Sequence, residues 1–145
     1  MSRPKQHRAS GAILLDTSAA VPLCTADHIA HLQVIAAIGD RPAGLAGHAW
    51  FETFSVLTRL PAPQRRSAGE VLDLLQHNLP NSVFVDAADQ LRFTEKLRDL
   101  SISGGAIYDG LVGLAAQAAE LPLLSRDRRA SATYLSLGIV VEFLD

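Results

Sequence analysis

Short, continuous apolar runs alternate along this chain with longer segments in which apolar residues recur at helical spacing. A continuous apolar run of a few residues is typical of a strand that is buried on both faces of a sheet. Such strands are predicted at residues 11–15, 83–85, 121–124 and 139–143, while residues 43–47 are ambiguous. Helices are predicted at residues 28–38, 48–60, 64–79, 87–100, 106–120 and 128–135. This alternation favours an α/β fold whose central, mainly parallel sheet is flanked by helices on both faces.

Capping and turn residues mark several of the boundaries between these segments. Asp16, Thr17 and Ser18 follow the first strand and are predicted to cap a helix, because their side chains accept bonds from free helical N–H groups. Glycine and proline predict a turn at residues 39–42. The helix at residues 64–79 is predicted to bury one broad apolar face made of Val71, Leu72, Leu74, Leu75 and Leu79.

The chain has 145 residues, of which 48% are hydrophobic, enough for one domain with its own core. No repeat or long linker divides it, so residues 11–145 are predicted to form one domain behind a flexible basic leader at residues 1–10. The apolar run after this leader is too short for a signal peptide, and no apolar stretch is long enough to span a membrane. A cytoplasmic location is therefore expected. The single cysteine, Cys24, allows no intrachain disulfide and no zinc spacing, and is predicted to be a buried structural thiol.

Four acidic residues stand against apolar segments instead of on charged surfaces: Asp16, Glu52, Asp109 and Asp127. An unpaired carboxylate next to a core is costly to desolvate, and a shared cation is one explanation for four of them. Carboxylate oxygens are the ligands that Mg²⁺ and Mn²⁺ prefer. Asp16 and Asp127 each follow a predicted strand. Since ligands of parallel sheets bind beyond the carboxyl ends of the strands, both acids are directed to the same edge.

The formal net charge of the chain changes sign when these four acids are left out of the sum. The formal net charge of −2, from 13 basic and 15 acidic residues, gives no global basic signature for nucleic acid. Without the four acids, 11 acidic residues stand against the 13 basic ones, and the remainder carries a formal charge of +2. That balance is compatible with a polyanionic substrate if a metal neutralises the site.

The four acids lie in segments that resemble, in order and at ordinary spacing, the four motifs of PIN-domain ribonucleases. These segments are residues 13–19, the helix that contains Glu52, residues 107–112 and residues 123–127. The similarity runs from residue 12 to residue 143 and is strongest to VapC-type toxins of bacterial toxin–antitoxin pairs. The resemblance implies a PIN-like three-layer fold and Mg²⁺- or Mn²⁺-dependent hydrolysis of RNA phosphodiester bonds. It also implies a homodimer and a VapB-like antitoxin whose C-terminal segment covers the acidic site.

The resemblance assigns a role to each acid. Asp16 is implied to be the central ligand of the cation, and Asp109 to bind it directly or through water. Glu52 either orients the nucleophilic water or completes the metal shell. Asp127 completes the acidic pocket, at a second metal in one alternative. A bound cation would lower the pKa of a water and stabilise charge on the phosphoryl oxygens.

Three hydroxyl residues and three arginines accompany the acids. Thr17 or Ser18 is expected to steady Asp16 or to contact the metal through water, and Ser125 to hold the loop that carries Asp127. The candidates for RNA phosphate contacts are Arg126, Arg128 and Arg129, for which a solvated turn is an equal alternative.

Each acid also has a simpler interpretation. Asp16 could be a helix cap, Glu52 a solvent-facing helix residue and Asp109 an N-terminal helix charge favoured by the dipole. Asp127, which lies between arginines, could be a surface ion-pair partner. The ordered set favours the shared site over these separate interpretations.

Two other classes of function are alternatives to a ribonuclease toxin. One is a PIN-like module that binds RNA or a protein without cleaving. The other is an enzyme that uses a strand-terminal aspartate as nucleophile, such as a phosphatase that forms an aspartyl-phosphate. Such a phosphatase needs a second acid two residues after the nucleophile, where this chain has Ser18. A phospho-receiver domain has an acidic pair before its first long helix, and this chain lacks that pair.

Overall fold

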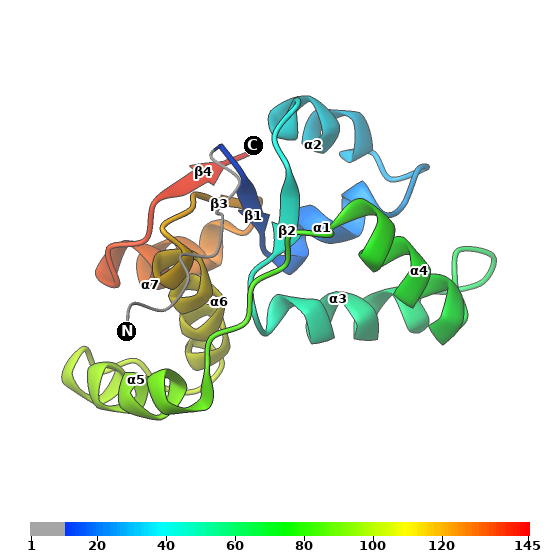
Figure 1. The fold of residues 1–145 in the computed structure, drawn as a ribbon. Helices are drawn as coiled ribbons and strands as arrows, with labels where there is room; N and C mark the ends of the chain where they lie inside the picture. Colours follow the sequence, from blue (N-terminus) through cyan, green and yellow to red (C-terminus); the bar gives the residue numbers. More distant parts are fainter. Residues whose placement is uncertain (1–10) are drawn as a thin grey trace, which may run out of the picture.

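The computed structural model describes residues 11–145, so the predicted leader at residues 1–10 lies outside the described residues. Its centre is a parallel four-stranded sheet in the order β2-β1-β3-β4 (Figure 1). The strands are β1 (Ile13–Leu15), β2 (Ala43–Leu45), β3 (Leu123–Ser125) and β4 (Val141–Phe143). The prediction of a mainly parallel sheet is confirmed.

Helices connect the strands along the whole chain. They are α1 (Thr17–Leu23), α2 (His31–Ile38), α3 (Ala49–Thr58), α4 (Ala68–Asn78), α5 (Ala87–Asp99), α6 (Ala106–Ala119), the 3₁₀ turn η1 (Arg128–Ala130) and α7 (Ser131–Ser136). Helix α1 contacts α2 and α3, and α3 contacts α4, whereas α6 contacts α5 and α7. In Figure 1 the first group lies to the right of the sheet and the second lies to its left and below.

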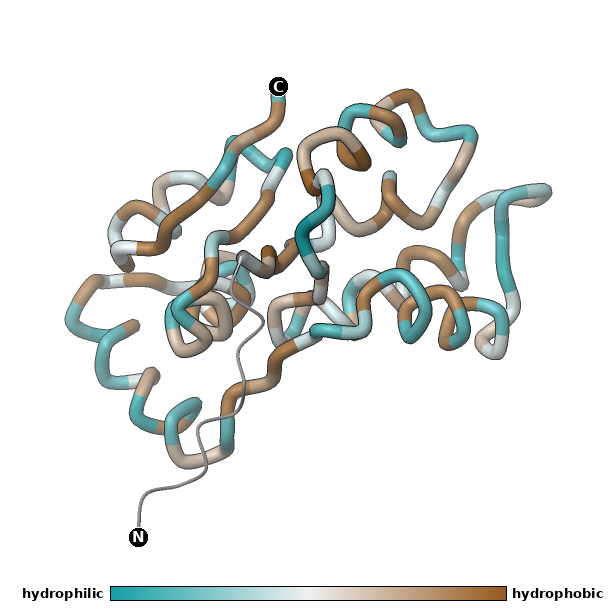
Figure 2. Tube along the Cα trace, turned by 45° about the horizontal axis from the view of Figure 1, so that its top comes forward, coloured by the Kyte–Doolittle hydropathy of each residue, from teal (hydrophilic) through white to brown (hydrophobic). Residues whose placement is uncertain are grey.

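The core is built on the inner strands. All three residues of β1 and the two leucines of β3 are fully buried, as the continuous apolar runs predict. The predicted thiol Cys24 is also buried and free. Helix α5 buries Phe93 and Leu97, and many of its other residues are hydrophilic (Figure 2).

Strand β2 resolves the ambiguous segment at residues 43–47. Its Gly44 lies so close to the following connection that an added Cβ would stand 2.1 Å from the Asn81 carbonyl oxygen. The predicted strand at residues 83–85 is wrong: Val83 forms only an isolated bridge with Ala46, and Phe84 is exposed. Three apolar residues without a strand partner along their length do not form a regular strand.

Helix α4 begins later than the prediction of residues 64–79. Ser67 accepts a bond from the Glu70 backbone N–H while the Glu70 side chain accepts from the Ser67 backbone N–H, so this capping box starts the helix at Ala68. The predicted apolar face is narrower than expected. Val71, Leu75 and Leu79 are fully buried, but Leu72 is 40% exposed. No helix within residues 11–145 combines the length and apolar content that crossing a bilayer requires.

Candidate active site

The candidate site lies at the carboxyl ends of β1 and β3. These strands are neighbours and run in parallel, so Asp16 directly after β1 meets Ser125 at the end of β3. The Ser125 hydroxyl donates to Asp16 Oδ2 at 2.5 Å across 109 positions of sequence. The predicted convergence of the first and last motifs at one edge of the sheet is therefore present in the structure.

Asp16 is buried and closely surrounded by donors. Its Oδ1 accepts bonds from the Ser18 hydroxyl at 2.5 Å and from the Ala19 backbone N–H at 3.3 Å, as the cap of α1. Its Oδ2 accepts from Ser125 and from the Tyr134 hydroxyl at 3.0 Å. Burial raises the pKa of Asp16, and these four hydrogen bonds oppose that rise because they favour the ionised form. The residue is 4% exposed, so the surrounding protein groups, not solvent, hold its carboxylate in position.

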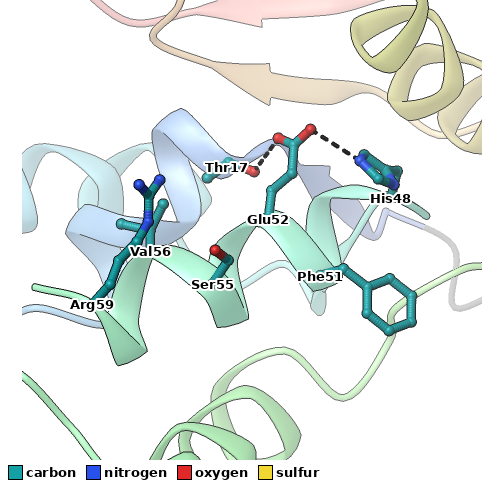
Figure 3. Close-up of a pocket in the computed structure, with 7 residues that line it drawn as sticks. All are labelled: Thr17, His48, Phe51, Glu52, Ser55, Val56 and Arg59. Carbon is teal, nitrogen blue, oxygen red and sulfur yellow. Dashed lines mark hydrogen bonds and ion pairs between the residues drawn. The ribbon is translucent and has the colours of Figure 1, made fainter.

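Glu52 projects from α3 toward the same site. Its Oε2 accepts from the Thr17 hydroxyl at 3.0 Å, and its Oε1 lies 3.3 Å from Nε2 of His48, one turn earlier on the helix (Figure 3). The His48 ring stacks on the ring of Tyr108, with centroids 5.1 Å apart. Of the two hydroxyl residues of which one was expected to steady Asp16 or to contact the metal through water, Ser18 bonds to Asp16 and Thr17 bonds to Glu52.

Asp109 connects all four acids electrostatically. It lies in the first turn of α6 and is partly exposed. Partial burial raises its pKa to about 6, and repulsion from Asp127, Glu52 and Asp16 adds to the rise, while Arg129 lowers it. The acids of the other three motifs therefore lie close enough to Asp109 to oppose its ionisation.

Asp127 lies on the loop after β3. Its backbone N–H donates to the Ser125 hydroxyl at 3.1 Å, the geometry expected if Ser125 holds this loop. The Asp127 carboxylate accepts from the Arg129 backbone N–H at 3.0 Å and lies 3.4 Å from Arg129 Nε. This acid therefore both caps the turn η1 and contributes to the field at Asp109.

The three arginines of this loop have different surroundings. Arg126 is half-buried, and its backbone N–H donates to the Ser18 hydroxyl at 2.7 Å. Arg128 pairs with Asp145 and lies over the Phe143 ring. Arg129 has a side chain that is 93% exposed. Their predicted contacts with RNA stay predictions, and the geometry favours Arg129 as the most accessible of the three.

A comparison with known families decides the identity of this arrangement. The family model described as "PIN domain" matches residues 13–134, which contain all four acids. The chain belongs to the PIN-domain family. It is 39% identical to Ribonuclease VapC27 of Mycobacterium tuberculosis over 129 residues, which cover 89% of this chain and 94% of that protein.

Solved structures agree with this PIN-domain fold. The Mycobacterium tuberculosis toxin VapC20, described as cleaving the sarcin-ricin loop, is similar with a TM-score of 0.65 at 20% identity, over 89% of this chain and 97% of that one. VapBC2 from Rickettsia felis, solved with a DNA fragment from its promoter, is similar with a TM-score of 0.63 at 14% identity, over 92% of this chain and 99% of that one. The three-layer PIN-like fold is confirmed.

Two side chains of this PIN-domain site escaped the sequence prediction. Tyr134 is buried, and its hydroxyl donates to Asp16 from 118 positions away. The His48 side chain, directly before α3, makes no cap bond and contacts Glu52. The spacing of His48 and Glu52, four residues apart on a predicted helix, is a signal that could have identified this pair.

PIN-domain ribonucleases are metal-dependent, and the donor set of this PIN domain suits a hard divalent cation. The four acids offer only oxygen ligands, and a cation would relieve the repulsion that raises the pKa of Asp109. Within residues 11–145, however, no three His, Cys, Asp or Glu side chains form a ready metal cage. These acids do not by themselves form a complete coordination shell in the described residues 11–145.

Proposed function

We propose that this PIN-domain protein is a VapC-type toxin, a metal-dependent endoribonuclease that hydrolyses RNA phosphodiester bonds through Asp16, Glu52, Asp109 and Asp127. The observation that carries the proposal is the electrostatic coupling of Asp109 to the other three acids, within a chain of the PIN-domain family. A carboxylate that three other acids repel favours a bound cation. Mg²⁺ or Mn²⁺ is the ion proposed.

Some of these residues would hold the cation, and others fix the orientation of the side chains that hold it. When bound, a divalent cation supplies a Lewis acid that stabilises charge on the phosphoryl oxygens and makes a water more acidic. Asp16 would face the cation from the buried side, where Ser18, Ser125 and Tyr134 fix its oxygens. Asp109 would hold it from the accessible side.

Glu52 is placed to orient the attacking water or to complete the shell of the cation. Thr17 and His48 bond to different oxygens of this carboxylate, which restricts its rotation. Asp127 would complete the acidic pocket from the loop that Ser125 holds. These positions assign every one of the four acids a task that depends on its ionised form.

A VapB-like antitoxin and a second copy of the chain are the proposed protein partners, in the cytoplasm. Support comes from an exposed aromatic cluster beside the site. Phe51 on α3 is 62% exposed, and its ring contacts that of Phe84 edge-on, with centroids 6.3 Å apart. Trp50 contacts Phe84 in the same way. Exposed aromatic clusters of this kind are typical of protein interfaces.

The test is cleavage of purified total RNA by antitoxin-free protein with Mg²⁺ or Mn²⁺. Wild type and the control Asp99→Asn, which changes an exposed acid on α5, are expected to give discrete products. Asp16→Asn is expected to give none while keeping the circular dichroism of the folded protein, and chelator is expected to stop the wild type. Full activity of Asp16→Asn would refute the proposal.

A second candidate is a PIN-like module that binds RNA or protein without cleaving it. The observation in its favour is that donors already occupy both oxygens of Asp16, and no ready metal cage is present in residues 11–145. Equal RNA affinity with Mg²⁺ and with chelator, together with no products from folded wild type, would favour this candidate.

A further inference from the structure

A pocket of about 380 Å³ lies along α3 beside the acidic site (Figure 3). Its lining consists of Thr17 on α1 and of residues on or next to α3, from His48 through Glu52 and Ser55 to Arg59. Its volume falls in the range of ~300–1,000 Å³ that is common for pockets that bind small ligands. We call it the α3 pocket. One of its walls therefore belongs to the acidic site, and the others extend beyond it.

Helical spacing brings the polar side chains of the α3 pocket to one side of α3. Glu52, Ser55 and Arg59 lie three and four residues apart in turn, so they follow one another along the helix surface. Figure 3 shows Glu52 and Arg59 extending to the same side, whereas Phe51 points away from Glu52. Arg59, the C-cap of α3, is seven positions after Glu52, which corresponds to a rise of about 10.5 Å along an ideal helix axis.

Arg59 differs from the arginines of the loop after β3. In the part of the chain that the structure describes, Arg126, Arg128 and Arg129 each contact a polar partner, namely Ser18, Asp145 and Asp127. The Arg59 side chain is exposed, and no hydrogen bond or ion pair to it is found among residues 11–145. Its five N–H donors are thus open to a ligand in the pocket.

We infer that the α3 pocket is a subsite for a nucleotide next to the cleaved bond of single-stranded RNA, with Arg59 bound to its phosphate. The inference rests on the proposed function and adds a binding residue to it. An RNA strand that presents one phosphate to the acids must run on over a neighbouring surface, where its next phosphates need counter-charge. Arg59 supplies that charge on a wall continuous with the site, and its planar guanidinium suits phosphate oxygens.

The remaining lining suits a nucleotide instead of a bare anion. The Ser55 hydroxyl lies between Glu52 and Arg59 and can bond to a ribose hydroxyl or a base edge. Val56 offers an apolar surface beside it. A base that is unstacked in a single strand can lie against such a surface, which a paired base in an RNA helix cannot reach.

Binding of a labelled, mixed-sequence single-stranded RNA tests the subsite without cleavage. It is measured with Mg²⁺ in the inactive Asp16→Asn background, with and without Arg59→Gln. We expect about tenfold weaker binding and a salt dependence whose slope falls by about one phosphate contact. Arg59→Lys is expected to keep the slope, since it keeps the charge. Arg98→Gln on α5, an exposed arginine paired only with its neighbour Asp99, is the matched control and is expected to change neither quantity.

Steady-state cleavage separates failure of the subsite from failure of the proposed function. With an otherwise wild-type protein, Arg59→Gln is expected to raise KM about tenfold and to leave kcat nearly unchanged, because Arg59 does not touch the reacting atoms. Unchanged KM and salt slope in an active enzyme would overturn the subsite alone. A folded wild type that cuts no RNA, but loses RNA affinity on Arg59→Gln, would support RNA binding at the α3 pocket and refute the nuclease. Weaker antitoxin binding with unchanged RNA binding would overturn the subsite in favour of a protein contact.

Discussion

Asp16 and Asp109 belong to one acidic site, but the protein treats their carboxylates in opposite ways. Asp16 is buried and accepts four hydrogen bonds that favour its ionised form. Asp109 is partly exposed, and its partial burial, together with repulsion from the neighbouring acids, opposes its ionisation and raises its pKa to about 6. The fold therefore positions one carboxylate with its own donors and leaves the repulsion at the other for a cation to relieve.

On the proposed function, this difference makes the site both rigid and able to bind metal. A carboxylate with four donors has few orientations left, so Asp16 supplies a fixed point at the end of β1. An acid with a raised pKa binds a cation in competition with a proton, so metal binding through Asp109, as proposed, would depend on pH. Substitutions at Asp109 and at the donors of Asp16 therefore measure the two roles separately.

The largest effect is expected from Asp109→Asn. Removing this carboxylate should lower cleavage by about a thousandfold, since a contact to the cation and its stabilisation of charge are lost. The same change should stabilise the metal-free protein at pH 8. With a folded pKa of about 6 against an ordinary 3.8, unfolding releases a proton between those values, so wild-type stability falls as pH rises from about 4 to 6.

Thermal unfolding of wild type and Asp109→Asn without metal, at pH 8 and at pH 4, checks that stability effect. The variant should melt at a higher temperature at pH 8, and the gap should shrink at pH 4, where the wild-type carboxyl is largely protonated. A variant that is less stable than wild type at pH 8 would mean that Asp109 is not repelled by its neighbours.

A smaller effect is expected when Asp16 loses a donor. Tyr134→Phe removes the hydroxyl and keeps the ring, and should cost about 1 kcal/mol of unfolding free energy. Ser125→Ala should cost about 1–3 kcal/mol, because it also leaves the Asp127 backbone N–H without its acceptor. Loss of a group that orients a ligand commonly lowers activity by about 10- to 100-fold.

Cleavage assays and denaturant unfolding of both variants measure these effects, with Ser136→Ala as the control. Ser136 is exposed on α7, and its hydroxyl bonds only to the backbone of its own helix. Full activity in both Tyr134→Phe and Ser125→Ala would show that Asp16 keeps its position without these donors, and the comparison with Asp109 would then lose its basis.

Much of the fold was predictable because the buried strands are short, continuous apolar runs in the sequence. The sheet edge that unites Asp16 with the loop of Asp127 follows from two strand-terminal acids and the rule for parallel sheets. The strand at residues 83–85 failed because an apolar triplet does not reveal whether a partner strand lies beside it. The start of α4 was misplaced because the capping box at Ser67 was overlooked.

The surroundings of the acids were less predictable than the acids themselves. The bond between Tyr134 and Asp16 joins residues 118 positions apart, and no local pattern marks a tyrosine for that contact. Arg126 and Arg129 look equivalent in sequence, yet one side chain is half-buried against Ser18 and the other is almost fully exposed. Such differences arise from tertiary packing, which a loop sequence does not encode locally.

Thermal unfolding with and without Mg²⁺ tests most directly the claim that the acids share a cation. At pH 8, Mg²⁺ at ten times its Kd should raise the Tm of wild type by about 3–6 °C. The rise should be absent in Asp109→Asn and should fade in wild type at pH 5, below the pKa of about 6 at Asp109. An unchanged wild-type Tm at pH 8 at any Mg²⁺ concentration, or an equal rise in Asp109→Asn, would contradict the account.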